Sequence, residues 1–140
     1  MGAAPLKKKR SLRQEEEGAG YLDAAVFLFV ACLSAAFLAV LAQVFVQKYS
    51  LDLFAAKAMR AAEIAGNTDV TGVIDALKAR TGLDPVVRWS ASYYSGTKVQ
   101  LNTQIRLTLT AEADIGFFAF GSFPVPLRAQ ATGYSEVYYK

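Results

Sequence analysis

An uncharged apolar run constrains this chain more than any other feature of the sequence. No charged residue lies between Ala24 and Ala42, and the next charge is Lys48. A bilayer core of about 30 Å needs about 20 apolar residues at a rise of 1.5 Å each, and the run meets that length. The apolar core of a secretory signal peptide is shorter, at roughly 7–15 residues. We therefore expect one membrane-spanning helix, and 140 residues leave room for one small domain beside it.

Basic residues gather on the N-terminal side of this run: Lys7, Lys8, Lys9, Arg10 and Arg13. Positive residues that flank a span stay on the cytoplasmic side of the membrane. The basic residues beyond the run are fewer, and Asp52 and Glu63 interrupt them. The sequence predicts a single-pass protein of the cell membrane, with a cytoplasmic N-terminus and an extracytoplasmic C-terminal domain. The basic cluster is too local for a nucleic-acid surface, so we expect no nucleic-acid partner.

The helical pattern continues past the apolar run. An apolar stripe follows at spacings of three and four, formed by Leu51, Phe54, Ala58, Ala61 and Ala65. Gly66-Asn67 is a stop signal. We predict one helix from about Tyr21 to Ala65, whose second half offers an alanine-rich face to a folded domain.

A second helix is predicted between Thr68 and Gly82. Its apolar face is formed by Val70, Val73, Ile74 and Leu77. Asn67 or Thr68 is expected to cap its start, and Gly82 to stop it.

Alternating apolar and polar residues then predict three or four antiparallel strands. The alternation covers residues 87–91, 99–101, 105–111 and 125–131, and the last strand is expected to run on through Val137. Ser95-Gly96 marks a turn, and Pro124 and Pro126 indicate an edge strand or an irregular entry. The expected fold class is α+β, with a long N-terminal transmembrane helix, a second short helix and a small antiparallel sheet. Residues 1–20 form a basic tail or leader, 21–66 the helix, and 67–140 the extracytoplasmic domain.

Side chains suited to catalysis or metal binding are scarce. The chain has no histidine and one cysteine, Cys32, which excludes an intrachain disulfide, cysteine–histidine zinc sites and histidine acid–base chemistry. The carboxylates of the second half, at Asp84, Glu112, Asp114 and Glu136, show no pairing in the sequence. We expect a protein that is not an enzyme and that carries no cofactor or metal.

Two features remain to be explained. Asp23 is a carboxylate at the start of the apolar run, where it favours the positive end of the helix. Four phenylalanines lie in a connection punctuated by glycine, at Phe117, Phe118, Phe120 and Phe123. Either these rings fold back over the core, or they form an exposed apolar patch that meets a partner or lipid.

The first part of the chain resembles a type IV prepilin. The resemblance rests on the basic tail, the Gly18-Ala19 step, the carboxylate of Asp23 and the long apolar helix. It implies that a membrane peptidase cuts between Gly18 and Ala19, which would make Asp23 the fifth mature residue. Prepilins usually have Glu at that position, where it pairs with a cation of a neighbouring subunit.

Further motifs resemble a narrower family of small bacterial membrane proteins, known only as a domain of unknown function. They are Gly18–Asp23, Ala61–Gly66, Thr81–Pro85, Gly116–Phe123 and Ala131–Lys140. That family is similar in layout to the TadE-like, pilin-related proteins of tight-adherence systems. The resemblance covers nearly the whole chain from Gly18 on, and implies a pilin-like architecture without known catalytic activity.

The leading hypothesis is a pilin-like or minor-pilin-like structural subunit of a surface appendage or of a secretion or conjugation apparatus. Its partners would be the membrane, other copies of itself or related subunits, and a prepilin peptidase. Small residues would permit close packing of helices, at Ala31, Ser34, Ala35, Ala39 and Ala42. The alternative is a membrane-anchored accessory protein that does not polymerise. A membrane-anchored hydrolase, the third class, has the least support in the residues.

Overall fold

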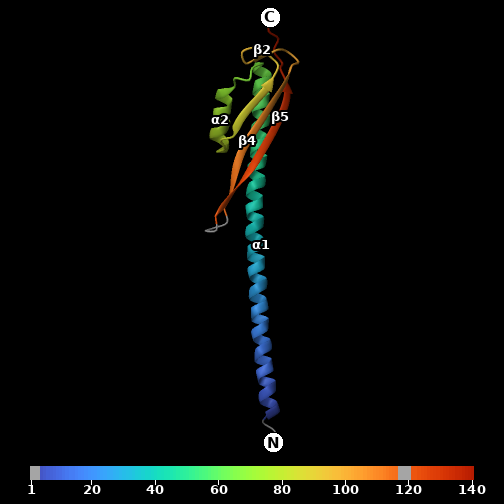
Figure 1. Ribbon diagram of the computed structural model, residues 1–140, viewed down its shortest axis with the longest axis vertical. Helices are drawn as coiled ribbons and strands as arrows, with labels where there is room; N and C mark the ends of the chain where they lie inside the picture. Colours follow the sequence, from blue (N-terminus) through green and yellow to red (C-terminus); the bar gives the residue numbers. More distant parts are fainter. Residues whose placement is uncertain (1–3, 117–120) are drawn as a thin grey trace. The chain divides into compact units, whose positions relative to one another are not determined.

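The computed structural model describes residues 4–116 and 121–140, with side chains described from Gly18 on. The elements in chain order are α1 (Ala4–Ala65), α2 (Thr71–Thr81), β1 (Val86–Ala91), β2 (Tyr93–Ser95), β3 (Lys98–Val99), β4 (Gln104–Gly116) and β5 (Ser122–Tyr134). One compact unit ends at Leu41, and the second is Ala42–Lys140. The predicted α+β class, with a long apolar helix, a short second helix and a small antiparallel sheet, is confirmed (Figure 1).

Helix α1 begins at Ala4, earlier than the expected start near Tyr21. The segment from Leu6 to Glu17 consists mostly of leucine, lysine, arginine, glutamine and glutamate, which are good helix formers. Pro5 falls in the first turn, where proline is tolerated. The prediction followed the apolar run alone and therefore placed the start of the helix too late.

The end of α1 at Ala65 agrees with the predicted stop signal. Gly66 adopts a left-handed conformation, with φ of 59°. The N–H of Gly66 donates to the carbonyl of Glu63, and the N–H of Asn67 donates to the carbonyl of Ala62. These two bonds form a Schellman motif, which satisfies the last carbonyls of the helix.

Helix α2 is shorter at its start than predicted. It begins at Thr71 after Val70, and neither Asn67 nor Thr68 caps it. The side-chain oxygen of Asn67 instead accepts from the N–H of Asp69 at 2.8 Å, and the N–H of Thr68 donates to the carbonyl of Thr97. Asn67 therefore stabilises the turn between the two helices, and Thr68 links that turn to the β2–β3 hairpin. Gly82 ends α2 as predicted.

The main sheet is antiparallel in the order β1-β4-β5, and β2 and β3 form a separate hairpin. Leu107 at the centre pairs with Trp89 of β1 and Ala131 of β5. The two prolines of β5 lie on an edge strand, as predicted. The pattern at 99–101 gives only the two-residue β3.

Strand β5 ends at Tyr134 and does not run on through Val137. The chain turns because Ser135 exchanges backbone hydrogen bonds with the loop before β4, accepting from Asn102 and donating to Thr103. The N–H of Glu136 then donates to the carbonyl of Glu63, so the tail continues against the end of α1.

The core lies between the sheet and the two helices of the Ala42–Lys140 unit. Helix α1 contributes the buried side chains of Leu51, Phe54, Ala55, Ala58, Met59 and Ala62. The predicted stripe is therefore wrong at its end, because Ala61 is half-buried and Ala65 is exposed. At 3.6 residues per turn, the buried face of α1 continues from Ala58 to Ala62 and not to Ala61. In α2, Ile74 and Leu77 are buried, as is Val70 just before the helix, whereas Val73 is exposed.

Candidate functional site

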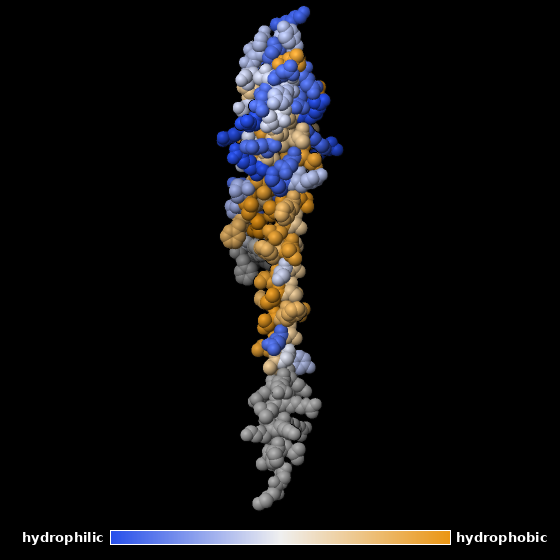
Figure 2. All heavy atoms as spheres, turned by 90° about the vertical axis from the view of Figure 1, so that its right-hand side faces the viewer, coloured by the Kyte–Doolittle hydropathy of each residue, from blue (hydrophilic) through white to orange (hydrophobic). Residues whose placement is uncertain are grey.

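The first candidate site is the exposed apolar surface of α1. Within the described residues, the helix from Gly18 to Ala65 is long and apolar enough to cross a membrane, and its most apolar window is not covered by the protein. The exposed large side chains include Val26, Phe27, Phe29, Leu33 and Phe37. The surface of this helix is predominantly hydrophobic in Figure 2. Such a surface needs lipid or another apolar helix around it.

The residues of the predicted processing site lie within this helix. Gly18, Ala19 and Asp23 are all exposed, and a Cβ added to Gly18 would meet open space. Gly18 and Gly20 weaken a helix locally, because glycine loses more backbone entropy on folding than other residues. The structure thus leaves the predicted cleavage bond accessible but in a helical conformation.

The small residues predicted to permit assembly also lie exposed on α1, at Ala31, Ser34, Ala35, Ala39 and Ala42. The hydroxyl of Ser34 donates to the carbonyl of Val30 at 2.8 Å. Its polar group is therefore satisfied within its own helix and needs no partner in the membrane. Cys32 is exposed on the same helix and is a free thiol.

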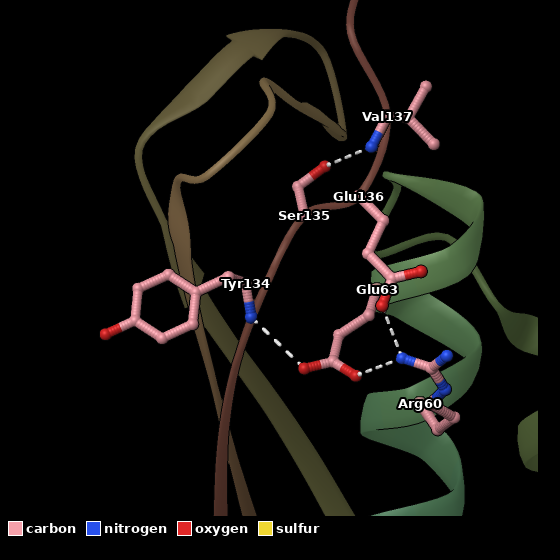
Figure 3. A network of polar contacts seen from close by, with 6 residues as sticks. All are labelled: Arg60, Glu63, Tyr134, Ser135, Glu136 and Val137. Carbon is pink, nitrogen blue, oxygen red and sulfur yellow. Dashed lines mark hydrogen bonds and ion pairs between the residues drawn. The ribbon is translucent and has the colours of Figure 1, made fainter.

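A polar junction joins the C-terminal tail to the end of α1 (Figure 3). Arg60 donates to Glu136 at 2.5 Å and to Glu63 at 3.2 Å. These hydrogen bonds, first the one to Glu136 and then the one to Glu63, raise the pKa of Arg60 above its ordinary value. The other carboxylate oxygen of Glu63 accepts from the N–H of Tyr134 at 3.2 Å. Glu63 therefore ties α1 to the end of β5.

Two glycines make this junction sterically feasible. A Cβ on Gly133 would overlap the carboxylate of Glu63, so glycine is required for that side chain to reach the backbone of β5. A Cβ on Gly66 would lie 2.5 Å from the Cβ of Val137. The motifs Ala61–Gly66 and Ala131–Lys140, noted for their resemblance, thus meet in space and pack against each other.

The last residues are held by a side-chain clamp. Gln100 accepts from the N–H of Tyr139 at 2.7 Å and donates to its carbonyl at 2.8 Å. The Tyr139 ring stacks on Tyr94, with ring centroids 6.2 Å apart, and the amine of Lys98 lies 5.3 Å from its centroid. The Tyr139 hydroxyl donates to the carbonyls of Ala65 and Gly66. The sequence reading missed Gln100 and Tyr139, because no local pattern links residues so distant in the chain.

A shallow groove of about 660 Å³ lies between α2 and β1 and is lined by Asp75, Lys78, Trp89 and Tyr93 among others. At its rim, Lys78 pairs with Asp84 at 2.6 Å, and this hydrogen bond raises the pKa of the lysine. The described residues contain no group of three metal-ligating side chains. Glu112 and Asp114 project outward from β4 without a described ion-pair partner.

The phenylalanine connection is only partly described. Phe117, Phe118 and Phe120 lie outside the described residues. Phe123, the first aromatic residue of β5, is 66% exposed.

A family model described as "Domain of unknown function (DUF4320)" matches residues 27–140. The match begins in the apolar part of α1 and runs through Lys140, the last residue of the Ala42–Lys140 unit, which we call the sheet unit. The predicted resemblance to a family with that label is confirmed. No curated protein and no solved structure matches the chain.

Proposed function

The chain belongs to the DUF4320 family, and from that premise we propose that it is a pilin-like structural subunit of a bacterial surface appendage or of a secretion or conjugation apparatus. It would act by assembly rather than by catalysis. Its N-terminus would stay in the cytoplasm, and the sheet unit would stand outside the membrane.

One observation carries this proposal. Helix α1 is uncharged and exposed through its apolar run, whereas one face of its continuation from Leu51 to Ala62 is buried in the core. The same helix would thus hold the protein in lipid and carry its folded unit. The charges of α1 resume at Lys48, just before the core begins.

The proposed mechanism follows from the surface of the run. Helices whose contact face is built from small residues approach closely in a membrane and gain dispersion energy. Ala31, Ala35 and Ala39 provide such a face, and Asp23 would pair with a cation of a neighbouring subunit. Contact between sibling helices would replace contact with lipid as the subunits assemble.

A second candidate is a membrane-anchored accessory protein that does not polymerise. It is favoured by the helical conformation across Gly18-Ala19, because proteases prefer exposed, unstructured segments. An uncleaved basic tail would keep each subunit in the membrane. Processing and assembly therefore need to be tested separately.

Cysteine cross-linking in membranes of the native host tests assembly. In a Cys32→Ser background, Ala35→Cys places a thiol on the small-residue face, and Leu33→Cys places one at the same depth on nearly the opposite face. We expect an oxidised homodimer for Ala35→Cys and little for Leu33→Cys. Equal, background-level dimer at both positions would reject assembly through this face and support the accessory protein. Intact mass of the native chain reports cleavage after Gly18.

A further inference from the structure

The apolar face of the β4–β5 hairpin extends beyond the core that covers it. Alternate residues of β5 lie on one face of the sheet. Their exposure rises along that face, from 2% at Ala129 and 7% at Leu127, through half-buried Val125, to 66% at Phe123. Ile115, the cross-strand partner of Phe123, is also only half-buried. An uncovered apolar end therefore projects from the sheet.

Two contacts fix the direction in which this end projects. The N–H of Tyr134 reaches Glu63 at 3.2 Å, and the amine of Lys48 donates to the carbonyl of Arg128 at 2.7 Å. Between these contacts α1 covers about 22 Å, at 1.5 Å per residue, and β5 covers about 20 Å, at 3.3 Å per residue. The similar lengths indicate that β5 runs along the C-terminal half of α1 (Figure 1).

Phe123 lies five residues past Arg128 along β5, which is about 16 Å of extended chain. It therefore lies beyond Lys48, on the side of Phe45 and Val46 within the Ala42–Lys140 unit. Phe45 and Val46, in this last uncharged part of the helix, are themselves exposed.

The charges divide at the same level. No charged residue occurs from Ile115 to Leu127. The next charged residue of β5 is Arg128, whose backbone carbonyl accepts from the amine of Lys48, and that amine also pairs with Asp52. Glu112 and Asp114 of β4 are exposed, and their side chains lie on the face of the sheet opposite to the half-buried Ile115. One face of the hairpin is thus apolar from Val125 to Phe123, and by the same alternation the side chains of Arg128, Glu112 and Asp114 lie on the other face.

We infer that the uncovered face formed by Ile115, Phe123 and Val125 of the β4–β5 hairpin inserts into the lipid bilayer surface from which α1 emerges. This inference rests on the proposed membrane anchoring of α1. Lipid is the occupant because β5 carries this face past Lys48 in the direction of Phe45 and Val46, which are exposed in the last uncharged part of α1, and because no charged residue interrupts the hairpin between Ile115 and Leu127. An apolar surface of this kind inserts about 5–10 Å into the boundary between head groups and acyl chains. Asp114 limits the depth, since a carboxylate is costly in hydrocarbon.

Tryptophan quenching in vesicles tests the insertion. The full chain, with Trp89→Phe as background, is reconstituted into phosphatidylcholine–phosphatidylglycerol vesicles that contain lipids brominated near the head of the acyl chain. Phe123→Trp probes the hairpin end. Tyr134→Trp, at the opposite end of the same strand and 56% exposed, is the matched control. Phe27→Trp, in the apolar run, reports the anchor itself.

We expect strong quenching at position 27, at least half of that quenching at position 123, and almost none at position 134. Quenching at 27 without quenching at 123 would overturn the inference and leave the anchor intact. A loss of quenching at 27 would overturn both the anchor and the inference. Cross-linking of position 123 to a second copy, without quenching, would assign the face to a protein contact and reject lipid.

A second measurement guards against misfolding of the tryptophan background. Phe123→Cys and Tyr134→Cys, each in a Cys32→Ser background, carry an NBD label whose emission shifts to the blue in an apolar environment. Phe123 lies on the uncovered face of β5. We expect a blue shift on vesicle reconstitution at position 123 alone. The same emission at both positions would refute insertion.

Discussion

Replacing Gly66 by alanine measures how firmly the C-terminal tail is held against the end of α1. Gly66 has φ of 59°, and its added Cβ would lie 2.5 Å from the Cβ of Val137. Gly82 supplies a matched control, because it ends α2 with φ of 67° and has open space around the same atom. Both substitutions force a left-handed conformation on alanine, but only Gly66→Ala also produces an overlap.

The magnitudes follow from these two terms. A left-handed alanine costs roughly 1–2 kcal/mol, and the stiffer unfolded chain offsets about 0.4–1 kcal/mol of that cost. Gly82→Ala should therefore lower the free energy of unfolding by about 1 kcal/mol. At Gly66 the tail must also move away, because apolar carbons prefer separations of about 3.5–4.0 Å. That movement breaks the hydrogen bond of the Tyr139 hydroxyl, which contributes about 1 kcal/mol, and loosens the packing of Val137. The expected total for Gly66→Ala is roughly 2–3 kcal/mol.

Urea unfolding of the full chain in detergent micelles, followed by the fluorescence of Trp89, gives both free energies. Trp89 lies in β1 and is half-buried, so its emission reports loss of the sheet unit. Equal destabilisation by Gly66→Ala and Gly82→Ala would refute the reasoning, because it would mean that the tail does not press on Gly66. A selective effect of Gly66→Ala that vanishes when Val137→Ala is added would confirm the overlap as its cause.

Three further outcomes are expected. Phe54→Ala should destabilise the chain by about 3–5 kcal/mol in the same unfolding assay, because Phe54 is 1% exposed. Phe123→Ala should have a far smaller effect, and comparable losses would contradict the assignment of Phe123 to the uncovered face. Alkaline phosphatase fused after Lys140 should be active, since the basic N-terminal cluster places the other end outside, and activity of a cytoplasmic reporter at that site would reverse the topology. Gly18→Leu should abolish the shortened mature chain in a host that contains a prepilin peptidase, as judged by intact mass. A full-length wild-type chain in that host would argue against processing.

Local patterns were sufficient for the elements of the fold. The alternation around Leu107 predicted β4, the two prolines predicted that β5 lies at an edge, and Gly66 and Gly82 predicted the two helix ends. Each of these features depends on residues within a few positions of one another. The start of α1 was placed too late because the charged segment before the apolar run has no hydrophobic pattern, although its residues have a high helix propensity.

The junctions were beyond the sequence pattern because they join distant parts of the chain. Nothing near Gln100 indicates that its amide pairs with the backbone of Tyr139. The signal for Glu63 was weak but present, since Gly133 interrupts an otherwise regular strand and marks a place where something approaches closely. Asn67 was assigned to a cap because the sequence does not reveal that β3 competes for the same turn.

The shared use of α1 has a practical consequence for dissecting the protein. A fragment that starts at residue 67 would lack Leu51–Ala62 and would leave the apolar face of its sheet bare to water. The compact unit begins only at Ala42, and it carries exposed Phe45 and Val46 with it. The smallest fragment expected to fold therefore keeps an apolar end and needs detergent for purification. For the same reason the sheet cannot be transplanted onto a foreign membrane helix unless that helix also supplies the core side chains that α1 contributes from Leu51 to Ala62.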